Sequence, residues 1–233
     1  MEIKEILVEG KTKKLYTVKE QNQLVMEFLN TLKGDSKQKD TLKGKGAINT
    51  EISAFMFEYL ASYNVPTHYI RKLDEKSLLV KKLDMIPIRL VIWNIATGNL
   101  AKRIGFKDGT ILETPVLELY LKNTKLRNPF INDYHAYTLG LCDRNEMDVI
   151  IRIGSKVNAV LKSFFARKKL SLAYFSLEFG RYENQIMLGD EISPDTFSIW
   201  EVTEDGKLNK KTFEMTPATA RTVLPKLKDI ILM

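Results

Sequence analysis

Two short apolar segments, 172–179 and 186–190, flank a polar stretch, and this pattern constrains the fold more than any other part of the sequence. The composition of the segments is typical of strands and the polar stretch is typical of a turn, so the pattern predicts an antiparallel hairpin. Each segment carries one carboxylate, Glu178 in the first and Asp190 in the second. With the turn centred near Asn184, these two positions are expected to face each other across the strand pair.

The two facing carboxylates of this hairpin would repel each other unless a cation neutralises them. Mg²⁺ is a suitable cation, because it binds one or two carboxylates together with substrate phosphates. A pair of solvated surface acids is the alternative interpretation, although the surrounding residues are strongly apolar. Gly180 and Gly189 lie where the backbone could approach a ligand closely. We therefore predict that Glu178 and Asp190 bind magnesium.

A glycine turn with the sequence Gly10-Lys11-Thr12-Lys13 is the second feature with chemical content. Backbone N–H groups exposed by such a turn, with lysines beside them, suit a polyphosphate. The segment is not a P-loop, because the P-loop spacing is absent, and an ordinary turn beside a basic strand remains the alternative. Together with the carboxylate pair, it predicts the nucleotide–magnesium site that kinases and ATP-dependent ligases share. The H-R-D and D-F-G motifs of protein kinases are absent from the sequence.

The composition of the 233 residues excludes several classes of protein. It is that of a folded soluble protein, and no run of about 18 apolar residues could span a membrane. The charged N-terminus does not resemble a secretory signal, and the single Cys142 cannot form an internal disulfide, so we expect a cytoplasmic location. Zinc sites rich in cysteine are excluded by the same count. Neither His68 nor His135 lies in a catalytic motif, and Cys142 has no defensible catalytic role.

The formal net charge of +7 points to an anionic ligand or partner. Part of it is local, since five lysines fall between Lys33 and Gly46. This stretch is interpreted either as a solvated loop or as a mobile loop over an anionic ligand. No stacking-aromatic motif or basic recognition helix accompanies it, so we expect neither a nucleic acid nor a membrane as partner.

The order of the segments predicts two lobes that meet near residues 85–100, with residues 1–85 in the first and 86–233 in the second. In the first lobe, a helix from about Ile48 to Asn64 would pack on an antiparallel sheet. The strands expected along the first hundred residues are 6–8, 14–18, 24–29, 68–73, 78–83 and 88–96.

The second lobe is predicted to combine helices with the hairpin. Asp143 and Glu146 have the spacing of a capping box, and an apolar face continues from there to about Lys168. A last helix is expected to begin at Thr216-Pro217, where proline suits the first helical position, and Pro225 should kink or interrupt it.

Seven motifs, in one order along nearly the whole chain, resemble those of phosphoribosylaminoimidazole-succinocarboxamide (SAICAR) synthetases. They lie at 10–13, 44–46, 66–68, 80–87, 101–105, 177–180 and 188–195. The resemblance implies an α+β fold, with an antiparallel β-rich N-terminal lobe, a larger α+β C-terminal lobe and ATP in the cleft between them. It also implies an ADP-forming ligase that joins carboxyaminoimidazole ribonucleotide to aspartate in purine biosynthesis. Homodimers or larger homo-oligomers are expected by the same analogy.

The same resemblance implies roles for individual residues, with ATP and Mg²⁺ as cofactors. The phosphates and the catalytic step would involve Gly10, Lys11, Lys13 and Asp35, the last from a shortened acidic loop at 30–36. The adenine would be held through the backbone of Lys81, Leu83 and Met85. Magnesium and ATP would be bound by Glu178 and Asp190.

The chain departs from the family pattern in the region that the resemblance assigns to the acceptor substrate. Trp93 and Ser198 stand where the family has arginines that are associated with the ribonucleotide phosphate, and Asn99 stands where it has serine. Tyr174 and Ser176 replace an aspartate and a lysine. Each charged hydrogen bond lost from a phosphate clamp costs about 1.5–3 kcal/mol, so we predict a diverged pocket. Its residues would be Trp93, Asn99, Lys102, Arg103, Ser176 and Ser198.

Three hypotheses about function follow. The leading one is an ATP-dependent, amide-forming ligase that acts on a carboxylate other than carboxyaminoimidazole ribonucleotide, with an amino acid or another amine as nucleophile. The second is a genuine SAICAR synthetase with compensating residues. The third is an ATP-binding pseudoenzyme that acts by interaction.

Overall fold

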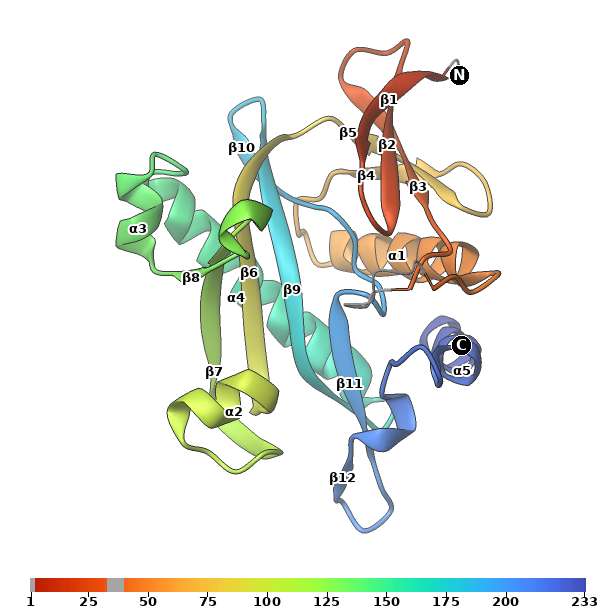
Figure 1. Cartoon of the computed structure of the whole chain (residues 1–233), viewed down its shortest axis with the longest axis vertical. Coiled ribbons are helices and arrows are strands. Elements are labelled where there is room, and N and C mark those ends of the chain that lie inside the picture. The colour runs from red at the N-terminus through yellow and green to blue at the C-terminus, as the bar shows by residue number, and fades with distance from the viewer. Residues whose placement is uncertain (1–2, 33–39) are drawn as a thin grey trace. The chain divides into compact units, whose positions relative to one another are not determined.

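The computed structural model describes residues 3–32 and 40–233, and the chain divides into two compact units (Figure 1). The first unit contains the chain up to Asp84 together with Glu191–Asp195 and Glu214–Met233. The second unit contains Met85–Asp190 and Thr196–Phe213. The boundary after residue 84 is close to the division proposed from the sequence, but two late segments belong to the first unit.

The first unit is built on an antiparallel sheet. Within residues 3–32 and 40–84, five strands follow the order β1-β2-β3-β5-β4, and each neighbouring pair is antiparallel. The strands are β1 Ile3–Glu9, β2 Lys13–Val18, β3 Gln23–Phe28, β4 Tyr69–Lys72 and β5 Ser77–Lys81. The tight connection predicted at Asp74-Glu75-Lys76 joins β4 to β5, which confirms that hairpin.

Helix α1, Lys45–Ser62, lies on this sheet, as the sequence predicted, although it begins three residues earlier than expected. Ala54 of α1 packs into an apolar cluster with residues of β3 and β5, and the Phe57 ring stacks on Tyr69 of β4 with centroids 5.9 Å apart. Helix α5, Ala220–Leu232, is bound to α1 by the ion pair between Lys228 and Glu51, at 2.6 Å.

The predicted start of the last helix at Thr216-Pro217 is wrong. Thr216 and Thr219 instead bond to each other in a turn, with the Thr216 N–H donating to the Thr219 hydroxyl at 2.9 Å, and the helix begins at Ala220. Pro225 does not interrupt the helix, which continues to Leu232. Its apolar face, including Val223, Leu224, Leu227 and Ile231, is buried, and this burial outweighs the lost backbone hydrogen bond.

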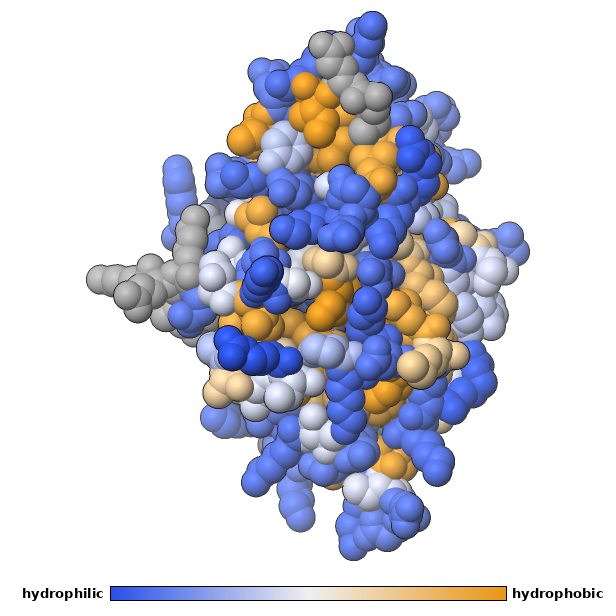
Figure 2. All heavy atoms as spheres, turned by 90° about the vertical axis from the view of Figure 1, so that its right-hand side faces the viewer, coloured by the Kyte–Doolittle hydropathy of each residue, from blue (hydrophilic) through white to orange (hydrophobic). Residues whose placement is uncertain are grey.

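Strand β1 is an exposed edge strand with an apolar sequence. All seven of its residues are exposed, among them Ile3, Ile6, Leu7 and Val8. Hydrophobic residues are accordingly visible near the top of Figure 2, where β1 lies. Its pairing with β2 is interrupted by two register shifts, as is common at sheet edges.

The second unit is built on a larger sheet with one long helix. In the described residues its strand order is β12-β11-β9-β6-β7-β8, and β10 pairs with β9 (Figure 1). The strands are β6 Asp84–Ala96, β7 Thr110–Leu121, β8 Phe130–Ile131, β9 Leu170–Tyr182, β10 Gln185–Gly189, β11 Phe197–Val202 and β12 Leu208–Asn209. The short helices are α2 Gly98–Ile104 and α3 Asp133–Thr138, with 3₁₀ turns at Thr124–Leu126 and Lys211–Phe213.

The long helix α4, Arg144–Ala166, begins as the sequence predicted. The Asp143 side chain accepts a hydrogen bond from the Glu146 N–H at 2.8 Å, and Glu146 accepts one from the Asp143 N–H at 3.0 Å, which forms the predicted capping box. Gly154 lets the helix approach Leu90 and Ile92 of β6. None of the helices in the described part of the chain has the length and apolar content needed to cross a bilayer.

The predicted hairpin forms from β9 and β10, but its register differs by one residue. Glu178 is paired with Gly189, so the prediction that it lies directly opposite Asp190 is wrong. The turn has two residues, Glu183 and Asn184, and Glu183 adopts a left-handed conformation with φ of 53°. Asp190 follows the end of β10 and is also left-handed, with φ of 58°. It is therefore one residue past the position opposite Glu178.

A test of the first unit's packing is the replacement of Gly46 by alanine. A Cβ atom at Gly46 would lie 2.5 Å from the backbone oxygen of Phe28, and backbone cannot move aside cheaply. We expect Gly46→Ala to cost about 1–3 kcal/mol and to lower the Tm by about 2–10 °C in calorimetry. Ala61→Ser, at an exposed position of the same helix, is the control. Equal Tm values for the two variants would contradict this packing.

Candidate functional site

The glycine turn of the first unit presents its two lysines differently. The Gly10 N–H donates to the Lys13 oxygen at 2.8 Å, which closes the turn between β1 and β2. Lys11 is exposed, Thr12 is buried and Lys13 is partly buried. A Cβ atom at Gly10 would lie 3.1 Å from the Lys13 oxygen, so the close turn favours glycine. The residues that the sequence assigned to phosphate binding are thus together on one turn.

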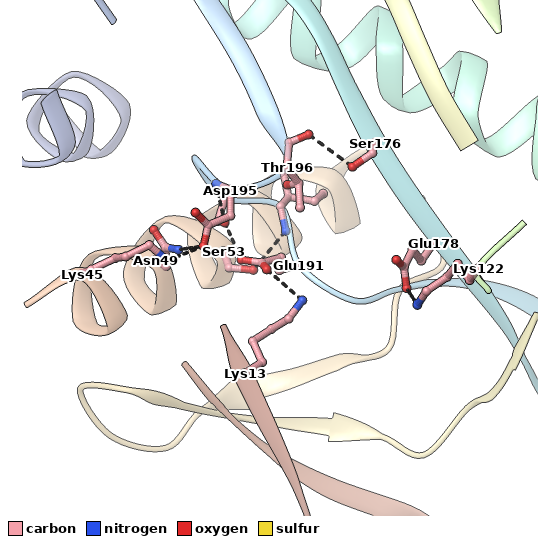
Figure 3. A network of polar contacts seen from close by, with 12 residues as sticks. Lys13, Lys45, Asn49, Ser53, Lys122, Ser176, Glu178, Glu191, Asp195 and Thr196 are labelled. Carbon is pink, nitrogen blue, oxygen red and sulfur yellow. Dashed lines mark hydrogen bonds and ion pairs between the residues drawn. The ribbon is translucent and has the colours of Figure 1, made fainter. Parts of the chain in front are cut away.

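The segment Glu191–Asp195 returns to this turn from a distant part of the chain (Figure 3). Glu191 lies 2.8 Å from the Lys13 ammonium, and its side chain is only 1% exposed. The Ser193 hydroxyl donates to the other oxygen of Glu191. The Ile192 N–H donates to the Ser53 hydroxyl of α1 at 3.2 Å. These contacts bind the segment to β2 and α1.

A buried ion pair holds the far end of the same segment. The Lys45 ammonium, at the start of α1, donates to Asp195, and the Asn49 amide donates to the same oxygen at 2.8 Å. The Lys45 side chain is 1% exposed and that of Asp195 is 5% exposed. Removing these charges from water is costly unless they are paired, so each depends on the other. Sequence analysis missed Glu191, Lys45 and Asp195 as site residues, although the run 188–195 was noticed.

Both sequence interpretations of the lysine-rich stretch are incorrect for Lys45, which is a buried partner of Asp195. Lys43 is exposed. Lys33, Lys37, Lys39 and the proposed catalytic Asp35 lie outside the described residues.

The segment assigned to adenine connects β5 to β6. Lys81 ends β5, and its N–H donates to the His68 oxygen at 2.7 Å. Leu83 lies in the connection, and Met85 is the second residue of β6, with 38% of its surface exposed. Leu83 is thus outside a strand. Its role and that of Met85 stay predictions.

In the second unit, Glu178 forms an ion pair with Lys122. The Lys122 ammonium, just beyond β7, donates to the Glu178 carboxylate (Figure 3). Asp190 is the residue after Gly189, which is paired with Glu178. Carboxylates are hard oxygen donors of the kind that Mg²⁺ prefers, but Glu178 is already neutralised by Lys122, so a metal would have to share or displace that partner. The described residues contain no group of three or more acidic, histidine or cysteine side chains suited to a metal, so substrate phosphates would have to complete the coordination.

The diverged positions of the acceptor region gather on one face of the second sheet. Tyr174 of β9 is the register partner of Ser198 on β11, and the Tyr174 ring lies 4.5 Å from the Trp93 ring of β6. Tyr174, Ser176 and Glu178 share this face, because side chains of a strand alternate between faces. The structure therefore places Trp93, Ser176 and Ser198 on the same face, and their role in binding an acceptor stays a prediction.

A buried carboxylate organises this face. Glu118 of β7 is 4% exposed and accepts hydrogen bonds from Trp93 Nε1 at 2.9 Å and from the Tyr120 hydroxyl at 2.8 Å. The Arg103 guanidinium of α2 forms an ion pair with the same carboxylate. We call Trp93, Glu118, Tyr120, Tyr174 and Arg103 the Trp93 cluster. Within it the positive charge of Arg103 is balanced by Glu118, and burial raises the pKa of Tyr174.

The remaining pocket residues lie on helix α2. Asn99 and Lys102 are both exposed there. Their helix follows β6 directly, with Thr97 as its N-cap. The Thr97 hydroxyl and the Gly98 N–H both donate to Asp108, at 2.7 and 2.9 Å, and these bonds hold the pKa of Asp108 below its usual value.

Of the two histidines and the cysteine, His68 and Cys142 are buried and His135 caps a short helix. Burial raises the pKa of Cys142 to about 11, so its thiol is protonated and unreactive at neutral pH. His68 is buried against the Phe57 ring, with centroids 5.2 Å apart. His135 forms the capping box of α3 with Asn132.

Comparison with known proteins gives consistent matches over nearly the whole chain. A family model described as SAICAR synthetase matches residues 6–221. Phosphoribosylaminoimidazole-succinocarboxamide synthases from Prosthecochloris aestuarii and Chlorobium limicola are 41% and 42% identical over 209 residues, which is 89% of this chain and of each relative.

Solved structures agree. The synthase from Ehrlichia chaffeensis superimposes with a TM-score of 0.90 at 29% identity, over 98% of both chains. A SAICAR synthetase (Type-2) in complex with ADP gives a TM-score of 0.88 at 35% identity, over 99% of this chain and 97% of the other.

The mixed α+β fold, the antiparallel sheets and these matches define an ATP-dependent, ADP-forming carbon–nitrogen ligase, a class that uses ATP with Mg²⁺. Within that class, the chain belongs to the SAICAR synthetase family. The fold class and the resemblance inferred from the motifs are confirmed.

The buried Lys45–Asp195 pair predicts a large loss of stability on removing one partner. Lys45→Met would leave a buried, uncompensated carboxylate, so we expect a loss of about 3–5 kcal/mol in the free energy of unfolding, measured with urea. Lys72→Met is the matched control, because its 3.7 Å pair with Glu51 is exposed and should contribute less than about 1 kcal/mol. Similar losses in both variants would show that the buried pair is not special.

Proposed function

We propose that this protein joins the carboxylate of one small molecule to the amine of another, with ATP converted to ADP and phosphate. The observation that carries the proposal is the family match over residues 6–221. The ordered Lys13 turn and the carboxylate-bearing hairpin support it, because they offer the charges that phosphates and Mg²⁺ require.

In this reaction an oxygen of the substrate carboxylate takes the γ-phosphoryl group, which gives an acyl phosphate and ADP. The amine nitrogen then attacks the carbonyl carbon, the bond from that carbon to the phosphate oxygen breaks, and the nitrogen loses a proton. Lys11 and Lys13 would stabilise the charge on the transferring group. Glu178 and Asp190 would hold Mg²⁺, which supplies charge neutralisation on the phosphates when bound.

The comparisons favour carboxyaminoimidazole ribonucleotide and aspartate as the two substrates, which would make SAICAR the product. Relatives at about 40% identity over 89% of the chain carry the name of that activity. They support this candidate better than the leading hypothesis from the sequence, in which the carboxylate is a different one.

The composition of the Trp93 cluster favours a carboxylate substrate other than carboxyaminoimidazole ribonucleotide. Where the family pattern has phosphate-associated arginines, this chain has the indole of Trp93 and the hydroxyl of Ser198. The nearby Arg103 is neutralised by the buried Glu118. Neither an indole nor a hydroxyl replaces the bidentate contact that an arginine makes with phosphate, so this face suits an uncharged or aromatic group better than a ribonucleotide phosphate.

Release of ADP with carboxyaminoimidazole ribonucleotide and aspartate tests the two substrate candidates. Turnover at about 1–1000 s⁻¹, the usual range for enzymes, would establish SAICAR synthesis and exclude the different-carboxylate hypothesis. A matched pair of probes, aminoimidazole carboxamide ribonucleotide and its ribonucleoside, reports the contribution of the phosphate to binding. Equal affinity for both would favour the different carboxylate.

The pseudoenzyme hypothesis has its own outcome in this assay. Binding of ATP without turnover on a broad panel of carboxylates and amines would support it.

The cytoplasmic location and the homodimer or larger homo-oligomer expected from the sequence stay predictions.

Asp190→Asn tests the metal assignment. Loss of one carboxylate charge should lower Mg²⁺-dependent ADP formation by about 100-fold or more, with a higher Mg²⁺ requirement. Asp205→Asn is the control, because Asp205 is an exposed partner of Lys207 in the same unit. Wild-type activity in Asp190→Asn at low Mg²⁺ would remove this residue from the metal site.

A further inference from the structure

The segment Glu191–Asp195 is bound at both ends by charged side chains from the beginning of the chain. Glu191 meets Lys13 of β2, and Asp195 meets Lys45 of α1. Between them, the Ile192 N–H is bound by Ser53. The segment is therefore bound to the glycine turn at Glu191 and to α1 at Ile192 and Asp195 (Figure 3).

Glu191 is placed to control the Lys13 side chain. Its two oxygens are divided between partners, since one lies 2.8 Å from Lys13 and the other accepts from Ser193. The Ser193 hydroxyl in turn accepts from the Asp195 N–H at 3.1 Å. The carboxylate is thus held by a hydroxyl of its own segment as well as by Lys13, so it has a second support besides the lysine.

The Lys13 ammonium keeps more contact with solvent than its partner does. The Lys13 side chain is 16% exposed, against 1% for Glu191. An ammonium has three donors, so it can bind Glu191 and other acceptors at the same time. A lysine side chain also loses rotamer entropy when it is ordered, and a fixed carboxylate removes that loss from the binding step.

We propose that Glu191 is a positioning residue, which holds the Lys13 ammonium ready for the nucleotide phosphates through a carboxylate fixed by Ser193. The proposal rests on the proposed function, in which Lys13 contacts phosphate. Glu191 directly follows Asp190, so one short stretch of chain carries both the proposed metal ligand and the group that orients the lysine.

A double-mutant cycle on binding of Mg²⁺–ADP by calorimetry tests this role. We expect Glu191→Gln and Lys13→Met each to weaken ADP binding about 10-fold, and the double variant to be little weaker than either single variant. Such coupling arises because each change removes the same oriented ammonium. A merely structural role would give effects that add, with a loss of Tm that accounts for both.

The neighbouring surface pair provides the matched control. Lys14 lies 3.1 Å from Glu9, and the two side chains are 25% and 54% exposed. The same cycle with Lys14→Met and Glu9→Gln should leave ADP affinity unchanged within about twofold. If Glu191→Gln folds poorly, Ser193→Ala removes one support of the carboxylate and should weaken ADP binding in the same direction by a smaller factor.

The outcomes separate this inference from the proposed function. Unchanged or tighter ADP binding in Glu191→Gln would overturn the positioning role, because tighter binding would mean that Glu191 competes with phosphate for Lys13. Absence of Mg²⁺–ADP binding by the wild-type protein would instead overturn the proposed function itself.

Discussion

The pairing of buried charges between the start of the chain and Glu191–Asp195 is the constraint on which the first unit depends. Glu191 and Asp195 are almost inaccessible to water, and a buried carboxylate is stable only with a positive, hydrogen-bonded partner. Lys13 and Lys45 supply these partners from 178 and 150 residues away. The late segment consequently folds as part of a unit that the chain had left at residue 84.

This arrangement has a consequence for the chemistry. The contact that stabilises the segment at Glu191 also orients Lys13, so under the proposed function stability and nucleotide recognition would rest on the same two side chains. In the second unit, another buried carboxylate organises the side chains around it. Glu118 accepts hydrogen bonds from Trp93 and Tyr120 and forms an ion pair with Arg103. The nucleotide part retains the charges that its family implies, while the acceptor part presents rings around a neutralised arginine. The relatives' activity and the composition of this face therefore point to different acceptors.

Local signals predicted much of the fold. The Asp143–Glu146 capping box marked the start of α4, because both hydrogen bonds lie within four residues. The β9–β10 hairpin was predicted from its apolar strands, but its register was wrong by one residue. The left-handed Glu183 permits a two-residue turn, and nothing in the local sequence required glutamate to adopt that conformation. The start of α5 was misplaced because the Thr216–Thr219 bonds compete with the helix.

The candidate site was predicted from two local patterns, the hairpin with its carboxylates and the glycine turn, and from the resemblance to the family. These patterns singled out Lys13, Glu178 and Asp190, whereas Lys45 was assigned to a solvated or mobile loop. Its burial depends on Asp195, a partner 150 residues later, and no local pattern reveals such a pairing. Glu118 was missed for the same reason, because its three partners come from β6, β7 and α2.

A crystal structure with Mg²⁺–ADP tests the central claim most directly, namely that Lys13, held by Glu191, contacts the nucleotide phosphates. We predict a phosphate oxygen within about 3.2 Å of the Lys13 ammonium, with the contact to Glu191 retained. Phosphates bound away from Lys13, or a Lys13 that leaves Glu191 to reach them, would contradict the account.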